Sequence, residues 1–235
     1  MTASKSHAVT IVVPAYNEVA NLEGAVKDVL GAAEHLLPVY EIIVVDDGST
    51  DETGILADQL ARRYDEVRVI HHARNLGLAQ AYKSGLAAAR LPYFTFVPGD
   101  GEVSAESIGV LLMAVGSADI VVPYHANPSA RPWHRRVLTS ISTAMLNRVS
   151  GHRLRYYQGP CVYPTALARS LPATSSGFFF LAEMLVHALW RGYSVVEVGL
   201  VHQERSGGRS KAVGVSNMAR ALLVVLRLWR ERGKV

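Results

Sequence analysis

The chain has 235 residues, of which 49% are hydrophobic and 19% charged, and its formal net charge is +4. This is the composition of a globular protein, with enough length for one substantial core and no low-complexity segment. Its single cysteine excludes an intramolecular disulfide and is typical of a reducing cytoplasm. We expect no signal peptide and no membrane-spanning helix, because no run of about eighteen apolar residues is present.

β-Branched runs alternate with amphipathic segments through the first half of the chain. We expect strands at 9–13, 41–45, 67–71, 93–97 and 119–122, with helices near 22–30, 55–61, 78–90 and 104–115. Ser49 or Thr50 is the expected cap of the second helix. Strands that alternate with helices of this length predict a mostly parallel sheet, which binds ligands at the carboxyl ends of its strands.

The second half is less regular. It predicts helices at 133–149, 179–190 and about 216–232, an extended segment at 155–163 and a strand at 194–201. We expect one α/β domain at residues 1–211. Residues 212–235 would form a basic amphipathic helix, either part of this domain or an element at the membrane surface. Its expected apolar stripe is Met218, Leu222, Val225, Leu226 and Trp229.

Basic residues gather after position 128, as at Arg131, Arg153 and Arg209. This asymmetry predicts an anionic partner such as phosphate or phospholipid, or a solvated basic surface. No nucleic-acid-binding module accompanies it, so we expect no nucleic-acid partner. A cytoplasmic protein in peripheral contact with the inner face of an anionic membrane fits this pattern.

Acidic residues follow three of the predicted strands: Glu18 after the first, Asp46 and Asp47 after the second, Asp100 and Glu102 after the fourth. Such side chains also occur in ordinary turns and caps. Their position at successive strand ends instead favours one crevice that holds a nucleotide diphosphate sugar with Mg²⁺ or Mn²⁺.

Two segments carry a specific resemblance. Residues 12–18 read Val-Val-Pro-Ala-Tyr-Asn-Glu, and residues 43–51 read Ile-Val-Val-Asp-Asp-Gly-Ser-Thr-Asp. Together they resemble the opening of the family 2 glycosyltransferases, and the resemblance extends over about residues 9–212. It implies a GT-A-like fold and inverting hexosyl transfer from a UDP- or GDP-sugar. The residues that it assigns to the donor are Pro14, Ala15, Tyr16, Glu18, Asp46, Asp47, Asn75, Gly77, Lys83, Asp100, Arg205 and Lys211.

The metal motif departs from the Asp-x-Asp of the family. In one register Asp100 is the second acid and Pro98 replaces the first, and in the other Asp100-Gly101-Glu102 is itself the motif. Both registers keep Asp100 and Glu102, which are therefore the expected metal ligands.

The second half resembles the dolichol- or polyprenyl-phosphate sugar synthases within this family. That resemblance assigns Arg136, Ser140 and Arg205 to the acceptor phosphate, and Arg205 with Lys211 to a loop over the donor diphosphate. These assignments imply transfer to polyprenyl phosphate. One departure is that Tyr124 and His125 stand where those enzymes usually have Ser-Arg, so one expected phosphate-binding arginine is missing.

The acceptor decides whether a general base is needed. A phosphate oxygen is already anionic, whereas a hydroxyl acceptor in glycan or secondary-metabolite synthesis requires a base. Glu183 is the candidate for that base, beside Asp100 as the other catalytic residue, and its alternative role is a structural partner of an arginine. A catalytically inactive nucleotide-sugar-binding protein is the third possibility.

His71 and His72 are expected to be satisfied loop histidines, and Cys161 a small core residue.

Overall fold

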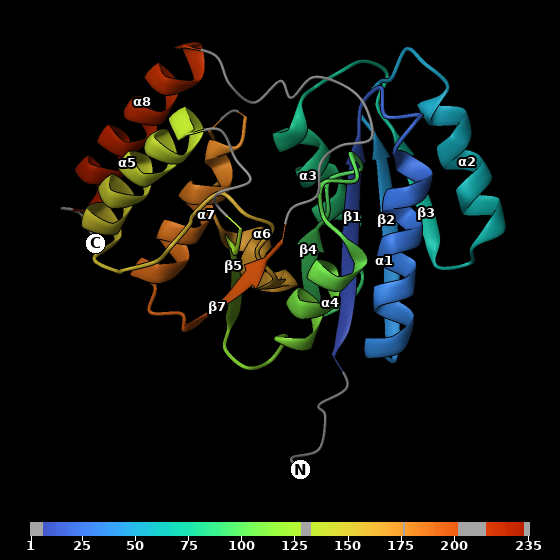
Figure 1. Cartoon of the computed structure of the whole chain (residues 1–235), viewed down its shortest axis with the longest axis horizontal. Coiled ribbons are helices and arrows are strands. Elements are labelled where there is room, and N and C mark those ends of the chain that lie inside the picture. The colour runs from blue at the N-terminus through green and yellow to red at the C-terminus, as the bar shows by residue number, and fades with distance from the viewer. Residues whose placement is uncertain (1–6, 128–132, 176, 202–214, 233–235) are drawn as a thin grey trace.

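Four parallel strands form the centre of the structure, a computed structural model that describes residues 7–127, 133–175, 177–201 and 215–232 (Figure 1). The strands are β1 (Ala8–Ala15), β2 (Val39–Asp46), β3 (Val67–His71) and β4 (Tyr93–Phe96). They lie in the order β3-β2-β1-β4, and a short β6 (Tyr163–Pro164) runs antiparallel beside β4. The carboxyl ends of the four parallel strands therefore lie at one edge of the sheet.

Helices cover both faces of this sheet. They are α1 (Leu22–Leu36), α2 (Thr53–Arg63), α3 (Leu78–Ala88), α4 (Ala105–Met113) and α6 (Thr165–Ser170). Val9, Ile11 and Val13 of β1 pack with α1, α2 and α4, whereas Val12 packs with α3 on the other face. A Cβ atom at Gly85 would lie 2.5 Å from a methyl carbon of Val12, so the glycine allows α3 to approach the strand. Burial on both faces explains the continuous β-branched run in the sequence.

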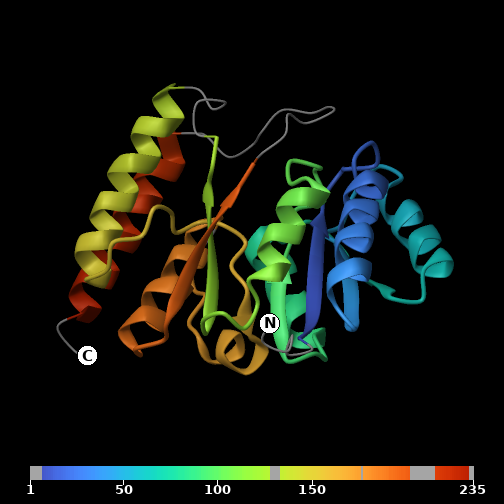
Figure 2. The ribbon, with the colours of Figure 1, turned by 60° about the horizontal axis from the view of Figure 1, so that its bottom comes forward.

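The expected fifth strand, β5 (Ile120–His125), does not extend this ladder. It pairs in parallel with β7 (Val195–Leu200), and the two form a separate sheet that Figure 2 shows beside the main one. A single antiparallel bridge joins Val121 to Val162. The extended segment expected at 155–163 is wrong for the most part, because only its last residue enters a strand.

Three long helices form a layer beside the sheets: α5 (Trp133–Ser150), α7 (Phe179–Trp190) and α8 (Val215–Arg232). α5 and α8 lie side by side in both views, and α7 packs against each of them (Figures 1 and 2). α7 is buried on nearly all sides, with Phe180, Met184 and Leu185 at 0% exposure. Such all-round burial explains its almost continuous apolar sequence.

The inward face of α8 agrees with its predicted stripe only in part. Val225 of that stripe is buried in the core beside Leu228, whereas Leu226 and Trp229 are exposed. The side chains of Met218 and Leu222 lie outside the described residues. Arg227, which does not belong to that stripe, reaches inward to α7. Within the described part of the chain, no helix is both long and apolar enough to cross a membrane.

Candidate active site

The loops that follow β1 and β2 are linked to each other. The Asn17 backbone N–H donates to Ser49 Oγ at 3.0 Å, and Asn17 Oδ1 accepts from the Thr50 N–H at 2.8 Å. Asn17 reaches this position with φ 55°, a left-handed conformation that asparagine tolerates better than most residues. The Glu18 N–H donates to Thr53 Oγ1 at 2.9 Å. Ser49 is therefore a bridge between loops and not the helix cap expected, and α2 begins only at Thr53.

Asp46 ends β2 and is 6% exposed. Its carboxylate accepts from the Ser49 N–H at 3.0 Å and contacts His71 Nδ1 at 3.0 Å, and His71 Nε2 in turn contacts Asp58 at 3.1 Å. Burial raises the pKa of Asp46, but the hydrogen bonds from Ser49 and His71 outweigh it and hold the pKa below its usual value. The bond to Asp46 also raises the pKa of His71. The site thus keeps an ionised acid at the edge of the sheet.

Asp47 holds the loop that contains Asn75 and Gly77. Its carboxylate accepts from the Leu76 N–H at 2.9 Å, the Gly77 N–H at 2.7 Å and His72 Nδ1 at 2.7 Å. Asp47 is 3% exposed. Its described contacts therefore hold the loop in place and favour this structural role over direct contact with the nucleotide sugar. Asn75 and Lys83, also expected at the donor, are exposed on this loop and on α3.

Gly48 lies where this loop crosses the end of β2. Its φ is +68°, and a Cβ atom placed on it would collide with the backbone of Arg74 and Asn75. Only glycine combines that conformation with so close an approach. The crossing brings the loops after β2 and β3 into contact.

Asp100 and Glu102 lie in the turn after β4. The Gly99 N–H donates to the Pro14 carbonyl at 3.0 Å, which fixes this turn beside the end of β1. Asp100 is 8% exposed, its Oδ1 accepts from the Glu102 N–H at 3.1 Å, and Gly101 between them has φ +71°. Pro14 and Ala15 are buried beneath, and Tyr16 and Glu18 are partly exposed. The expected donor residues of β1 and the expected metal ligands therefore occupy one edge.

The acids at this edge suit a metal ion that is shared with a ligand. The described residues contain no cluster of three or more histidine, cysteine or acidic side chains able to hold a metal by themselves. Mg²⁺ and Mn²⁺ commonly use one or two carboxylates and complete their coordination with phosphate oxygens and water. Two carboxylates in one turn fit that arrangement.

Arg136 and Ser140, the residues expected at the acceptor phosphate, are exposed on α5. The Ser140 hydroxyl donates to the Arg136 carbonyl at 3.0 Å. Both line a surface cavity of about 430 Å³, together with Trp133, Val137 and Ile141. Arg205 and Lys211 lie outside the described residues.

Glu183 has the surroundings of a structural residue. It is 2% exposed, and its carboxylate accepts from the Thr174 N–H, the Thr174 hydroxyl and the Ser175 N–H at 2.7–3.0 Å. Arg227 of α8 lies 2.6 Å from the same carboxylate. Burial raises the pKa of Glu183, but the bonds from Thr174 and Ser175 and the charge of Arg227 outweigh it and lower the pKa. These contacts occupy the carboxylate and favour the arginine-paired role over that of a general base.

Comparison with known proteins gives the family. The sequence matches the family described as Glycosyl transferase family 2 over residues 10–174, which contain the carboxyl ends of β1, β2, β3 and β4. The chain belongs to glycosyl transferase family 2. The polyprenol monophosphomannose synthase of Mycolicibacterium smegmatis is 32% identical to this glycosyltransferase over 96% of the chain and 88% of the relative. The dolichol-phosphate mannosyltransferase of Pyrococcus furiosus is 29% identical over 97% of the chain and 65% of the relative.

Solved structures confirm the GT-A-like fold that was expected. The glucosyl-3-phosphoglycerate synthase of Mycobacterium tuberculosis, in complex with Mn²⁺, UDP and phosphoglyceric acid, superposes with a TM-score of 0.72 at 18% identity. That alignment covers 97% of the glycosyltransferase and 79% of the synthase. Another structure of the synthase contains Mg²⁺ and UDP and gives a TM-score of 0.68 at 20% identity.

The sequence missed several residues that position the site of the glycosyltransferase. His71 and His72 are satisfied histidines, as expected, but their partners are the strand-end acids Asp46 and Asp47. Asn17 links two loops, and nothing in its local sequence announced that contact. The one signal available in the sequence was a histidine pair at the end of one strand, His71 and His72, beside an acidic pair at the end of the neighbouring strand, Asp46 and Asp47.

Proposed function

We propose that this glycosyltransferase moves a hexosyl residue from a UDP- or GDP-sugar to polyprenyl phosphate, with inversion at the anomeric carbon. An oxygen of the acceptor phosphate attacks the anomeric carbon. The bond from that carbon to the donor diphosphate breaks, and the nucleoside diphosphate leaves with the electron pair. The observation that carries the proposal is that the expected donor residues at the ends of β1 and β2 and both expected metal carboxylates lie at one edge of the sheet.

The donor is proposed to lie over the ends of β1 and β2. Tyr16 and Asp46 would contact the base and ribose there, and Asp47 and Gly48 would fix the loop beneath them. Asp46 suits this role because its lowered pKa keeps it an acceptor for hydroxyl and N–H groups. Preorganised acceptors of this kind lose little entropy when the donor binds.

Mg²⁺ or Mn²⁺ is the proposed cofactor, with Asp100 and Glu102 as its protein ligands. When bound, such a cation supplies Lewis-acid stabilisation of the departing diphosphate. The short turn between β4 and α4 holds the two carboxylates, and the Gly99–Pro14 hydrogen bond keeps that turn beside the proposed donor site.

Polyprenyl phosphate is the proposed acceptor because it needs no general base. Glu183 is held by Thr174, Ser175 and Arg227, which fits an acceptor that arrives already ionised. Arg136 is proposed to bind the acceptor phosphate through its guanidinium group, since arginine matches phosphate oxygens in a bidentate geometry. The M. smegmatis relative, named a polyprenol monophosphomannose synthase, supports the same acceptor class and mannose as the first sugar to test.

The α5–α8 layer is proposed to rest on the membrane that contains this acceptor. Large apolar side chains are exposed along both helices: Trp133, Val137 and Ile141 on α5, and Leu223, Leu226 and Trp229 on α8. An apolar face beside arginines is typical of helices that lie at the surface of an anionic bilayer. This location would be the cytoplasmic face of the membrane, where nucleotide sugars are available.

The test is a panel of UDP- and GDP-sugars, GDP-mannose among them, assayed with polyprenyl phosphate and with soluble sugar acceptors. Each reaction is run with Mg²⁺ or Mn²⁺ and again with EDTA, and the product is identified by mass spectrometry. We expect a polyprenyl-phosphate hexose, with product formation abolished by EDTA. Transfer only to hydroxyl acceptors would overturn the acceptor, and nucleotide-sugar binding without transfer or hydrolysis would overturn the enzymatic role.

A further inference from the structure

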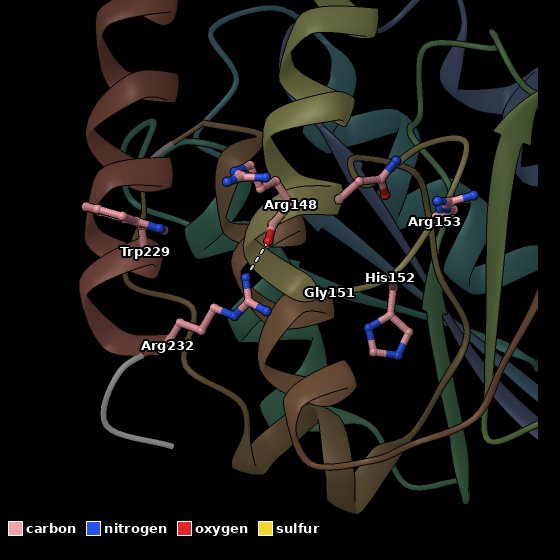
Figure 3. Close-up of a pocket in the computed structure, with 7 residues that line it drawn as sticks. Arg148, Gly151, His152, Arg153, Trp229 and Arg232 are labelled. Carbon is pink, nitrogen blue, oxygen red and sulfur yellow. Dashed lines mark hydrogen bonds between the residues drawn. The ribbon is translucent and has the colours of Figure 1, made fainter.

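A second cavity lies at the end of α5 that points away from the proposed active site. Its volume is about 450 Å³, and it is formed by the end of α5, the loop that follows it and the last turns of α8 (Figure 3). Arg148 lies twelve residues after Arg136 on α5, which places the two about 18 Å apart along the helix axis. The cavity is therefore distinct from the region proposed for the acceptor phosphate.

The lining of this cavity is strongly basic. Arg148, Arg153 and Arg232 contribute three guanidinium groups, and His152 and Trp229 complete the wall (Figure 3). None of the described residues that line it is acidic, and within the described chain none of its three arginines forms a salt bridge. Arginines brought together in a concave surface without a counter-charge are suited to phosphate oxygens.

The nearest acid in sequence is already engaged elsewhere. Glu231, next to Arg232, contacts His187 at 3.2 Å and Arg227 at 3.8 Å on the α7 side of the helix. It is the one acid in the sequence of α8, and α5 has none. The positive charge of the cavity is therefore not balanced from within these two helices.

Helix capping explains only part of this arrangement. Arg232 Nη1 donates to the Arg148 carbonyl at 2.6 Å, which satisfies an acceptor in the last turn of α5. One cation is enough for that role. The side chains of Arg148 and Arg153 make no described hydrogen bond, so capping does not account for them.

We propose that this cavity is a binding site for a phosphate-bearing anion, either free phosphate or the head group of an anionic phospholipid. Arg148 and Arg153 contact the phosphate oxygens, and Arg232 holds the floor of the site by its bond to α5. Trp229, at 62% exposure, stands at the rim. An indole in that position suits the interfacial region of a bilayer, where head-group phosphates lie.

Trp229 provides a local probe for free phosphate. The protein has three tryptophans, so its nitrogen-15 NMR spectrum contains three indole N–H signals, and the Trp229→Phe variant assigns one of them. Inorganic phosphate is titrated at constant ionic strength. If the cavity takes free phosphate, the Trp229 signal shifts saturably, and the Arg148→Gln/Arg153→Gln variant abolishes that shift.

Vesicles test the phospholipid source. Sedimentation with phosphatidylcholine vesicles is compared with sedimentation after part of the lipid is replaced by phosphatidylglycerol. If the cavity takes a head group, the anionic lipid increases binding and the Arg148→Gln/Arg153→Gln variant loses about tenfold or more in affinity, as the loss of charged hydrogen bonds predicts.

A charge-matched control separates the cavity from net charge. Arg62→Gln/Arg63→Gln removes two exposed arginines from α2, on the opposite side of the molecule (Figure 1). We expect this control to retain the wild-type response in whichever assay is positive. The proposal is overturned if neither assay responds, or if the control loses as much affinity as the Arg148→Gln/Arg153→Gln variant. Urea unfolding verifies that both double variants are folded.

Discussion

The edge of the main sheet and the α5–α7–α8 layer both bury carboxylates, but they hold them in different ways. Asp46 and Asp47 are bound by backbone N–H groups and by histidines from the next strand, within loops that follow each other in space as in sequence. Glu183 also accepts from backbone N–H groups, those of Thr174 and Ser175, but its charged partner is Arg227, forty-four residues further along the chain. Partners at the sheet edge leave the loops arranged for a ligand, whereas the partner in the layer fastens one helix to another.

This difference predicts that the sheet edge serves catalysis and that the helical layer serves the stability of the fold. The sheet edge is defined by parallel strand order, which brings all strand ends together whatever their side chains are. The helical layer depends on particular side-chain contacts. Substitutions at the edge should therefore change the kinetic constants more than the free energy of unfolding. Substitutions in the layer should change the free energy of unfolding more than the kinetic constants.

The largest expected effect is that of Asp100→Asn on turnover. Loss of a metal carboxylate weakens charge stabilisation of the leaving diphosphate and should lower kcat by about 100-fold or more. The free energy of unfolding should change little, because asparagine keeps the oxygen that accepts from Glu102. Steady-state kinetics and urea unfolding measure the two quantities. Glu106→Gln, an exposed acid in α4, is the matched control, and equal kcat values for the two variants would contradict the assignment.

Glu183→Gln tests the other side of the comparison. It should lower the free energy of unfolding by about 2–3 kcal/mol, because the substitution removes the charge that pairs with Arg227 and one of the two oxygens that accept hydrogen bonds from residues 174 and 175. The kcat of the folded enzyme should stay within about threefold of wild type, whereas loss of a general base would lower it about 100-fold or more. Arg227→Gln should destabilise similarly, and the double variant should lose less than the sum of the two. A fall in kcat without a loss of stability would make Glu183 catalytic.

Asp47→Asn should affect both stability and kinetics, because Asp47 lies at the sheet edge and also holds a loop in place. Asparagine offers one acceptor oxygen where the carboxylate uses two, so one loop hydrogen bond is lost and stability should fall by about 1–2 kcal/mol. The loop at 72–77 should loosen and raise the KM for the donor more than it lowers kcat. Unfolding and kinetics with Asp65→Asn, an exposed acid, provide the reference. An unchanged KM would show that this loop does not support the donor.

The smallest expected effect is a pH dependence from His71 and Asp46. The raised pKa of His71 stabilises the fold fully below its unfolded value of about 6.5, and this contribution is lost as pH rises through the folded value. The lowered pKa of Asp46 acts above about pH 4 and is lost in acid. His71 is 43% exposed, so the change should stay under about 1 kcal/mol. The free energy of unfolding is measured across the range from about pH 6 to about pH 9. Its pH dependence should become weaker in His71→Gln and stay as in the wild type in His35→Gln, which alters an exposed histidine.

Sequence alone predicted the sheet edge well, because strand ends follow from the buried β-branched runs and from the parallel connection of strands. It placed Glu18, Asp46, Asp100 and Glu102 on one edge of the sheet. It did not predict the cross-links between loops. Ser49 or Thr50 was the expected helix cap, but both bond to Asn17, which lies more than thirty residues earlier in the chain.

The helical layer was predicted less well. Periodicity gave the bounds of α5 and α7 closely, but of the stripe predicted for α8, Val225 is buried and Leu226 and Trp229 are exposed. An amphipathic stripe shows that a helix has a side to bury, but a helix with apolar residues on two sides has no preferred one until its neighbours are known. Here Arg227 and Leu228 turn toward α7 and the core, and Trp229 is left outside.

The close approach of Gly48 to the neighbouring loop predicts which residues position 48 tolerates. Because any side chain there would strike the backbone of Arg74, a library randomised at this codon and selected for transfer should return glycine almost exclusively. A neighbouring library at exposed Glu52 should return many residue types. Suppressors of the rare survivors at Gly48 should then map to residues 72–77, the segment that would have to move aside.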